Sequence, residues 1–392
     1  MTGSSTLPGR PAARLATRSG VAALTAVLVV VSATPALAAT WSVTPTPNPL
    51  AQSNRFTGVH AQSATSAWAV GWGDTGGTPS VRPVVARWNG SAWSSVTSPS
   101  FNGDAYLFGA DGDATTVWAV GQAGSRPLAE RWNGSSWSVV STPLPSGATA
   151  GQLTGVKSLA ASSAWAVGSV TMPTSPGRRT LAMRWNGTSW TIVPTPNPNS
   201  IQNLLVAVDA VAANDVWAVG NWGHDGYGGD TTEGMVLRWN GSSWTNMALP
   251  AFDGTLRRTK LHDVVVLASN DVWVVGAAFS WTLFSTVPYV LHWNGQSWQQ
   301  GTIPNAPTGE FHAVTALSPT KVYAAGLKNY GQTLVARWNG STWSQESTPS
   351  PSGSNYLVDA SATGTGTVWT VGSRHDSGSW TMRTLAERTT NG

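Results

Sequence analysis

The sequence predicts an all-β protein: a seven-bladed β-propeller of four-stranded antiparallel blades, whose ring is closed by an N-terminal strand that completes the last blade. Three observations predict this fold. They are a sevenfold repeat, an Asn-Gly hairpin at a fixed place in the repeat, and a last repeat whose final piece lies at the other end of the chain. Each repeat contains an aromatic strand of the Val-Trp-Ala-Val-Gly type, centred on Trp68, Trp118, Trp165, Trp217, Trp273, Tyr323 and Trp369.

Four strand signals follow one another within a repeat, as the fourth repeat illustrates. Residues 205–211 form a short, largely apolar run, and residues 215–219 form a second strand that ends at Gly220. Residues 235–239 give a third strand, and residues 243–246 begin a fourth. Four antiparallel strands in about 50 residues is the size of one propeller blade.

An Asn-Gly dipeptide joins the third and fourth strands. Because Asn and Gly tolerate positive φ angles best, we expect a two-residue type I′ hairpin there. The dipeptide recurs in six repeats, at Asn89, Asn133, Asn186, Asn240, Asn294 and Asn339. Turn chemistry therefore explains the Asn-Gly-Ser and Asn-Gly-Thr sequons, which carry no weight as glycosylation sites.

The seventh repeat stops at Gly392, before its closing Trp. The missing piece is present at residues 41–49, whose sequence Trp-Ser-Val-Thr-Pro-Thr-Pro-Asn-Pro matches residues 190–198, which close the third repeat. We expect residues 41–44 to pair with residues 384–389 and so cover two sheet edges. An open solenoid would need distinct end caps instead. The predicted blades cover residues 54–97, 105–141, 151–194, 202–247, 259–300, 309–347, and 354–392 together with 41–44.

Residues 1–38 are predicted to be a secretory signal peptide. Three arginines precede an apolar core at residues 21–31, and Ala-Leu-Ala at residues 36–38 is a small-x-small cleavage site. The remaining residues 39–392 form a single predicted domain. The apolar core is too short to span a bilayer comfortably, so we expect a secreted, extracellular protein without stable membrane insertion. An uncleaved anchor is the alternative.

The charge balance argues against a nucleic-acid partner. The signal segment holds three arginines and no acids, so its removal leaves 19 basic and 18 acidic residues. The pI of about 9.6 is therefore no indication of nucleic-acid binding, which needs clustered basic residues. Cysteine is absent, which excludes disulfides and thiolate metal sites. Packing alone must stabilise the fold, and we expect a monomer.

The repeat resembles those of known propeller families. Asp-Val-Trp-Ala-Val-Gly followed by Leu-Arg-Trp-Asn-Gly-Ser-Ser-Trp is similar to blades of secreted bacterial β-propellers, to kelch-like and Asp-box repeats, and to seven-bladed bacterial lectins with a Trp-Asp-Gly-Ser-x-Trp hairpin. The resemblance covers the whole mature chain and implies a propeller scaffold. The Asp-box proper is Ser-x-Asp-x-Gly, and Asn replaces its Asp here. Neither sialidase activity nor a particular sugar site follows from the resemblance.

Most of the 23 tryptophans fall in three fixed columns of the repeat, and we expect them to fill the gaps between blades. A basic residue precedes one of these tryptophans in each of six repeats. It is expected to cover ring faces or to bond strand-end carbonyls. This column comprises Arg87, Arg131, Arg184, Arg238, His292 and Arg337.

The innermost strands carry a second, ionisable column. At the position after the central apolar residue it reads His60, Asp111, Lys157, Asp209, Val265, Thr315 and Asp359, with Asp263 two residues before Val265. In a propeller these strands surround the central channel, so the ionisable members are expected to form a polar ring. Three interpretations remain open: a hydrated channel, a ligand or substrate site, and a hard-cation site for calcium at Asp209 and Asp263. No other cofactor is indicated.

A second candidate site lies on the face opposite the Asn-Gly hairpins. The four tryptophans outside the columns lie in or beside loops of that face, at Trp72, Trp222, Trp281 and Trp380. Polar and aromatic neighbours there are His224, Asp225, Tyr227, Tyr330, His375 and Asp376. Exposed aromatic rings beside short polar groups suit a glycan surface. Alternatively, these tryptophans only cap the blades.

Enzyme motifs are absent from the sequence. It contains no phosphate-binding Gly-rich loop before a helix, no Gly-x-Ser-x-Gly and no His-Glu-x-x-His. The leading interpretation is a secreted, non-catalytic binding propeller that recognises a glycan, a cell-wall component or an extracellular protein. The runner-up is a hydrolase or lyase acting on a polysaccharide or peptide at the acidic channel. A structural interaction scaffold is the third.

Overall fold

The computed structural model describes residues 1–5, 9, 40–113, 115–173, 177–199, 202–223, 232–251, 254–329, 331–376, 378–379 and 381–390. The chain separates into two units, Met1–Leu37 and Ala38–Gly392. The apolar core and the cleavage site of the predicted signal peptide lie outside the described residues. Across the described ranges, no helix is long and apolar enough to cross a membrane.

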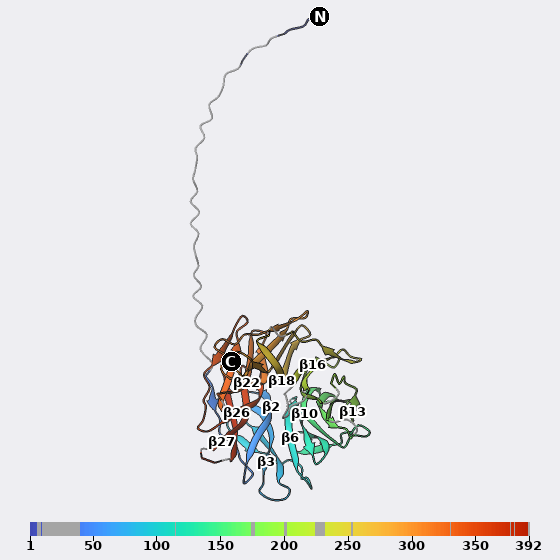
Figure 1. Ribbon diagram of the computed structural model, residues 1–392, viewed down its shortest axis with the longest axis vertical. Coiled ribbons are helices and arrows are strands. Elements are labelled where there is room, and N and C mark those ends of the chain that lie inside the picture. The colour runs from blue at the N-terminus through green and yellow to red at the C-terminus, as the bar shows by residue number, and fades with distance from the viewer. Residues whose placement is uncertain are drawn as a thin grey trace. The chain divides into compact units, whose positions relative to one another are not determined.

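The second unit is an all-β propeller, which confirms the predicted fold class (Figure 1). Its described strands form seven sheets of four antiparallel strands. Blade one runs outwards from the channel as β2 (Asn54–Ser63), β3 (Ser66–Asp74), β4 (Val81–Trp88) and β5 (Trp93–Ser95). Blade two is β6 (Ala105–Gly112), β7 (Val117–Ala123), β8 (Arg126–Trp132) and β9 (Trp137–Val140). Blade three is β10 (Ala150–Ala160), β11 (Ser163–Thr171), β12 (Arg178–Trp185) and β13 (Trp190–Val193).

The remaining blades repeat this order. Blade four is β14 (Asn203–Ala212), β15 (Asp215–Trp222), β16 (Glu233–Trp239) and β17 (Trp244–Met247). Blade five is β18 (Leu256–Ala268), β19 (Asp271–Ser280), β20 (Ser285–Trp293) and β21 (Trp298–Gln300). Blade six is β22 (Gly309–Ser318), β23 (Lys321–Lys328), β24 (Gln332–Trp338) and β25 (Trp343–Glu346). Blade seven is β26 (Asn355–Ala362), β27 (Val368–His375), β28 (Met382–Thr389) and the N-terminal β1 (Ser42–Val43).

The N-terminal strand closes the ring as predicted. In β1, Ser42 lies opposite Arg388 and Val43 lies opposite Glu387 of the antiparallel strand β28. The Thr44 N–H extends this pairing by donating to the carbonyl of Ala386 at 2.9 Å. The first full blade therefore lies beside the last, and in Figure 1 the blue strand β2 lies next to the red strands β26 and β27.

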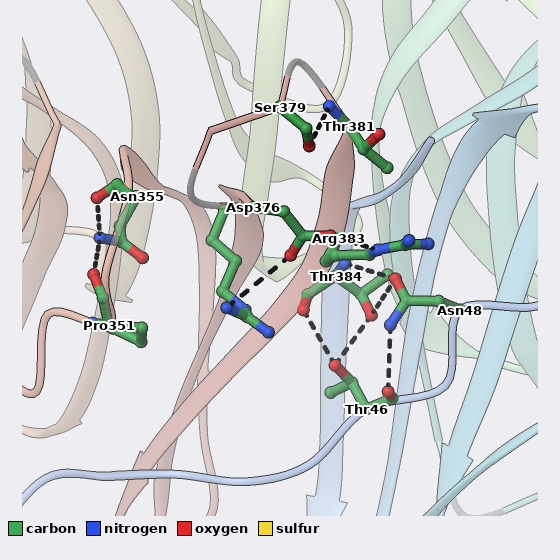
Figure 2. A network of polar contacts seen from close by, with 11 residues as sticks. Thr46, Asn48, Pro351, Asn355, Asp376, Ser379, Thr381, Arg383 and Thr384 are labelled. Carbon is green, nitrogen blue, oxygen red and sulfur yellow. Dashed lines mark hydrogen bonds and ion pairs between the residues drawn. The ribbon is translucent and has the colours of Figure 1, made fainter. Parts of the chain in front are cut away.

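A short polar segment after β1 reinforces the closure (Figure 2). The Thr384 N–H donates to Asn48 Oδ1 at 2.9 Å, and the hydroxyls of Thr384 and Thr46 are 2.8 Å apart. Blade three contains the same arrangement, in which the Thr180 N–H donates to Asn197 Oδ1 at 2.9 Å. The sequence match between the chain start and the end of the third repeat thus corresponds to the same set of contacts.

The Asn-Gly hairpins lie where the sequence places them, but the predicted type I′ turn is wrong. The paired tryptophans enclose a four-residue loop rather than a two-residue one, and only the glycine has a positive φ, 100° at Gly90. The side chain of Asn89 accepts the N–H groups of Ser91 at 2.9 Å and Ala92 at 3.0 Å. Because this Asx turn satisfies the loop amides, Asn does not need the left-handed conformation.

A β-bulge interrupts every pair of innermost strands, and the sequence analysis missed it. In blade one the register shifts between Phe56 and Gly58, so Thr57 is the extra residue. The bulge brings the carbonyl oxygen of Arg55 so close to Gly71 that a Cβ atom there would overlap it. The glycine that ends Val-Trp-Ala-Val-Gly is therefore required by close backbone approach. Its equivalents are Gly121, Gly168, Gly220, Gly276, Gly326 and Gly372.

The tryptophan columns fill the interfaces between blades, as predicted. The ring of Trp68 in blade one is buried against Trp132 and Trp137 of blade two, with centroids 4.8 and 5.2 Å away. The interface between blades six and seven differs: Tyr323 of blade six packs on Trp41, which precedes the closing strand, with centroids 6.2 Å apart. Trp41 therefore fills the gap between two blades, as Trp137 does between blades one and two.

Five of the six members of the basic column lie over aromatic rings, as predicted, namely Arg87, Arg131, Arg184, Arg238 and His292. The Arg238 guanidinium is 4.8 Å from the centroid of Trp217 and forms two hydrogen bonds to Asp215, at 3.0 and 3.2 Å. In blade five, the His292 ring stacks on Trp273 at 4.0 Å and its Nε2 lies 2.8 Å from Asp271. Cation–π contact and an ion pair thus cover the buried rings on this side.

A buried acid in β28 makes the stability depend on pH. Glu387 is 0 % exposed, and burial raises its pKa to about 8. The folded protein therefore holds a proton that the unfolded chain releases above its ordinary pKa of 4.5. Stability from this group is present below that pH and is lost as the pH rises toward 8.

Replacing Glu387 by Gln is expected to flatten this pH dependence. Thermal melts between pH 5 and pH 9 should show a melting temperature that falls more steeply for the wild type than for Glu387→Gln. Each unit of pKa shift corresponds to about 1.4 kcal/mol. Glu233→Gln, at an exposed residue of β16, should behave like the wild type. Parallel curves for the wild type and Glu387→Gln would contradict the prediction.

Candidate functional site

The seven innermost strands surround one central cavity of about 230 Å³. Residues of β2, β6, β10, β14, β18, β22 and β26 all line it. The inner strands approach closely because small residues follow several bulges: a Cβ on Gly58 would lie 2.8 Å from the Cα of Gly109. Side chains from distant parts of the sequence therefore converge on a single space.

Four predicted channel residues form a continuous chain of polar contacts across blades one to four, here called the charged chain because Lys157 and Asp111 carry charge. His60 Nδ1 lies 2.8 Å from Asp111 Oδ1. Lys157 Nζ lies 3.8 Å from Asp111 Oδ2 and 2.8 Å from Asp209 Oδ1. The single lysine therefore bridges two carboxylates that belong to the blades on either side of its own.

The ion pairs set the protonation states of this chain. Burial raises the pKa of Asp111, but the charge of Lys157 and the hydrogen bond from His60 outweigh it and lower the pKa to about 2. The carboxylates of Asp209 and then Asp111 raise the pKa of Lys157 further above its ordinary value. The lysine and Asp111 are thus both charged at neutral pH.

The channel carboxylates also bind backbone amides of the next blade. An innermost strand has one edge without a sheet partner, so its N–H groups need acceptors. Asp111 accepts the N–H of Ser158 at 2.8 Å, and Asp209 accepts that of Val266 at 2.7 Å. The other two acids do the same at 2.7 Å, Asp263 from Val314 and Asp359 from Val59. These acids therefore tie neighbouring blades together.

The register of blade seven corrects one predicted alignment. Members of the ionisable column lie opposite the buried aromatic residue of the next strand, and in blade seven the residue opposite Trp369 is Ser361. Asp359 lies two residues earlier, opposite Val371, and matches Asp263 of blade five, which lies opposite Val275. Strand alternation repeats every two residues, so it cannot distinguish these two positions.

Asp263 and Asp359 differ from Asp111 in the direction of their pKa shifts. Burial raises the pKa of Asp359 to about 7. Burial, with the charge of Asp359 added, raises the pKa of Asp263 well above its ordinary value. Each also accepts the N–H of the following residue at 2.8 Å. Neither acid has a lysine or arginine partner comparable to Lys157 among the ion pairs of the described residues.

The predicted calcium ligands, Asp209 and Asp263, contact a lysine and backbone amides. The ammonium group of Lys157 lies 2.8 Å from Asp209 Oδ1, and the other Asp209 oxygen accepts an amide. Both oxygens of Asp263 accept amides. A positive charge and N–H donors are therefore the partners of these oxygens in the structure, and the calcium site stays a prediction.

A cluster that the sequence analysis missed lies at the bulges of blades five and six. His262 and His312 are the extra residues of these two bulges, and Glu310 precedes the second. Their ligand atoms all lie within 4.8 Å of one another. The signal available in the sequence was a histidine at the same place in two consecutive repeats. The bulge hides it, because an extra residue breaks the alternation from which side-chain direction is predicted.

The described tryptophans of the loop-rich face divide into two kinds. Trp72 is partly buried between Arg55, whose guanidinium lies 3.6 Å from the ring centroid, and Tyr106 at 5.1 Å. Trp222 is partly buried against the hydrophobic core between blades three and four. Trp281 alone of these three is exposed, with 39 % of its surface accessible. The capping interpretation therefore fits Trp72 and Trp222.

Other residues predicted for this face lie outside the described residues, namely His224, Asp225, Tyr227, Tyr330 and Trp380. Of the remaining pair, His375 contacts Tyr356 edge to face at 6.0 Å. Asp376 accepts a hydrogen bond from Arg383 Nε at 2.9 Å (Figure 2). This pair therefore takes part in contacts within blade seven.

The chain is similar to solved propellers in fold. YCF48 bound to a D1 peptide is 13% identical with a TM-score of 0.54, covering 89% of this chain and 96% of that chain. YCF48 from Cyanidioschyzon merolae is 14% identical with a TM-score of 0.55, covering 89% and 98%. A PL25 ulvan lyase, a polysaccharide lyase bound to a GlcA–Rha3S saccharide, is 11% identical with a TM-score of 0.53, covering 82% and 90%. No protein-family model and no curated protein matches the chain.

These low identities establish the seven-bladed propeller and no particular activity. One of the similar propellers binds a peptide and another a polysaccharide, so the fold accommodates partners of both classes. The chain is therefore a seven-bladed β-propeller, and only its own residues can indicate its function.

Proposed function

We propose that the protein is an exported, non-catalytic binding propeller that recognises an extracellular partner through its loop-rich face. The observation that carries this proposal is the apolar tip of the β19–β20 hairpin. Trp281, Leu283 and Phe284 are 39, 55 and 74 % exposed there. Exposed apolar side chains gathered in one place mark interaction surfaces.

The tip is organised before any partner binds. Trp281 meets Phe279 and Phe284 edge to face, with centroids 5.4 and 5.9 Å away. Phe284 also has a positive φ of 45°, which is unfavourable for a bulky residue. Such strain at an exposed aromatic residue supports a functional role.

The chemistry of the tip favours a protein partner over a glycan. A sugar needs directional hydrogen bonds beside an aromatic plane. The exposed residues that follow Trp281 are Thr282, Leu283 and Phe284, so two of the three are large apolar side chains and one hydroxyl is the only polar group among them. The guanidinium of Arg257 lies 5.7 Å from the Trp281 centroid and adds a positive charge beside this apolar surface. We therefore expect a partner segment with apolar and acidic side chains.

The channel supports a hydrolase or lyase less well. A glycosidase needs carboxyl groups that are free to face one bond of the substrate. Asp111 and Asp209 are held by Lys157 and by backbone amides. Asp263 and Asp359 accept two amides each. These contacts indicate that the four channel acids connect neighbouring blades rather than act on a substrate.

Replacing an aromatic residue of the exposed tip is expected to weaken partner binding strongly. Biotinylated protein should capture a protein ligand from the culture supernatant of the producing cells, and the affinity can be measured by biolayer interferometry. Trp281→Ala and Phe284→Ser should each weaken binding by about 30-fold or more, as central aromatic residues of interfaces do. Val139→Ser, at an exposed apolar residue of β9, is the matched control and should leave the affinity unchanged. Equal affinities for all variants, or capture of glycans alone on an array, would contradict the proposal.

A further inference from the structure

We propose that His262, Glu310 and His312 form a binding site for one divalent transition-metal ion such as Zn²⁺, at the bulges of blades five and six beside the central cavity. Two imidazole nitrogens and one carboxylate oxygen are a common donor set for zinc. Their ligand atoms lie within 4.8 Å of one another. The site is separate from the loop tip and from the charged chain around Lys157.

The hydrogen bonds of both histidines leave the same nitrogen for a metal. His262 Nδ1 lies 2.9 Å from the Phe311 carbonyl, and His312 Nδ1 lies 3.0 Å from the Leu357 carbonyl. A carbonyl oxygen only accepts, so each Nδ1 carries the hydrogen. Metal-bound histidines are usually held in this way, with the second nitrogen donating to a backbone carbonyl.

The contact between His312 and Glu310 requires a positive charge. His312 Nε2 lies 3.1 Å from Glu310 Oε1. Since Nδ1 already carries one hydrogen, Nε2 presents either a second proton or a lone pair directed at a carboxylate. Either protonation or a cation between the two groups relieves the repulsion. A bound metal ion satisfies both groups and gives the third ligand a partner.

His262 is suited to act as that third ligand. Its ring centroid lies 5.0 Å from that of His312, on the neighbouring blade. Because its Nδ1 is bonded to the Phe311 carbonyl, the other ring nitrogen is the one that remains for a metal.

Comparison with other blades shows that the histidines offer more than the fold needs. At the same bulge position, the hydroxyl of Thr57 bonds the Leu107 carbonyl at 2.7 Å, and that of Thr154 bonds the Leu205 carbonyl at 2.9 Å. A threonine therefore suffices to connect two blades at this place. The additional nitrogen of each histidine is not needed for that bond.

The equivalence of Thr and His gives matched variants. His262→Thr and His312→Thr keep a side chain that can bond the next strand and remove only the metal ligand, while Glu310→Gln keeps the shape of the glutamate. Titration of EDTA-treated mature protein with ZnCl₂ in a calorimeter should show one ion per chain. Each variant should weaken zinc binding by at least about 100-fold, the upper range for losing even an outer partner of a ligand. His292→Gln, at a histidine paired with Asp271, should bind zinc as the wild type does.

Two further measurements separate loss of the site from loss of the fold. Without metal, the melting temperatures of the threonine variants should match that of the wild type. Co²⁺ should give the visible absorption bands of a four-coordinate ion in the wild type and not in the variants. The proposal is overturned if the wild type binds no stoichiometric zinc, if the variants bind it as tightly, or if anomalous scattering from zinc-soaked crystals places the ion elsewhere.

Discussion

Deletion of residues 41–44 is expected to lower the free energy of unfolding by more than about 5 kcal/mol. Loss of a buried tryptophan side chain alone costs about 3 to 5 kcal/mol. Trp41 is buried and packs on Tyr323. The deletion also removes the pairing of β1 with β28 and leaves an edge strand exposed where the ring was closed. Urea denaturation followed by tryptophan fluorescence measures the change.

Two single substitutions locate the effect within the deleted segment. Trp41→Ala should cost about as much as Trp190→Ala, because both are the buried tryptophans that end equivalent repeats. Val43→Ala, at a residue 40 % exposed, should change stability by less than about 0.5 kcal/mol. If the deletion lowers stability by only about 1 kcal/mol, as trimming an ordinary terminus would, the closing strand does not hold the ring together.

Replacing Lys157 by Met is expected to destabilise the fold at neutral pH by up to about 3 to 5 kcal/mol. That is the usual effect of removing one partner from a buried ion pair, and the Lys157 side chain is 29 % exposed. The substitution leaves Asp111 and Asp209 without the ammonium group that lies 3.8 and 2.8 Å from them. Side-chain volume is nearly kept, so the loss reports charge rather than packing. Chemical denaturation as a function of pH is the measurement.

The pH dependence identifies the cause of this loss. In the wild type the pKa of Asp111 is lowered to about 2, so its contribution is present above pH 4 and is lost as the pH falls toward 2. In Lys157→Met the carboxylates protonate more readily, so the difference from the wild type should shrink as the pH is lowered from 7 to 4. Lys328→Met, in β23, should show no such change. A constant difference at every pH would mean that the lysine acts through packing.

The propeller could be predicted because its signals lie within single strands and turns. The Trp column, the Asn-Gly dipeptide and the displaced last piece each recur or match within the sequence itself. The predicted pairing of the two ends follows from those signals, and β1 does pair with β28. The ionisable column likewise placed His60, Asp111, Lys157 and Asp209 around one channel, where they form ion pairs.

The contacts between blades could not be predicted from these local sequence patterns. The sequence indicated acids in the channel but not that they accept amides of the next blade, because those amides belong to strands about 50 residues away. It also misaligned Asp359 by two residues, since a shift of two keeps a side chain on the same face of the strand. Only the hydrogen-bond register between β26 and β27 decides between the two alignments.

The sequence by itself determined the number of blades, the order of strands and the closure of the ring, because each depends on a pattern repeated along the chain. Only the tertiary structure decided which polar side chains contact one another. The bulges turn His262 and His312 toward Glu310, and the ring brings an exposed tip at Trp281 to the loop-rich face. These contacts depend on the extra residue of each β-bulge and on the packing of one blade against the next. Neither can be predicted from a local sequence pattern.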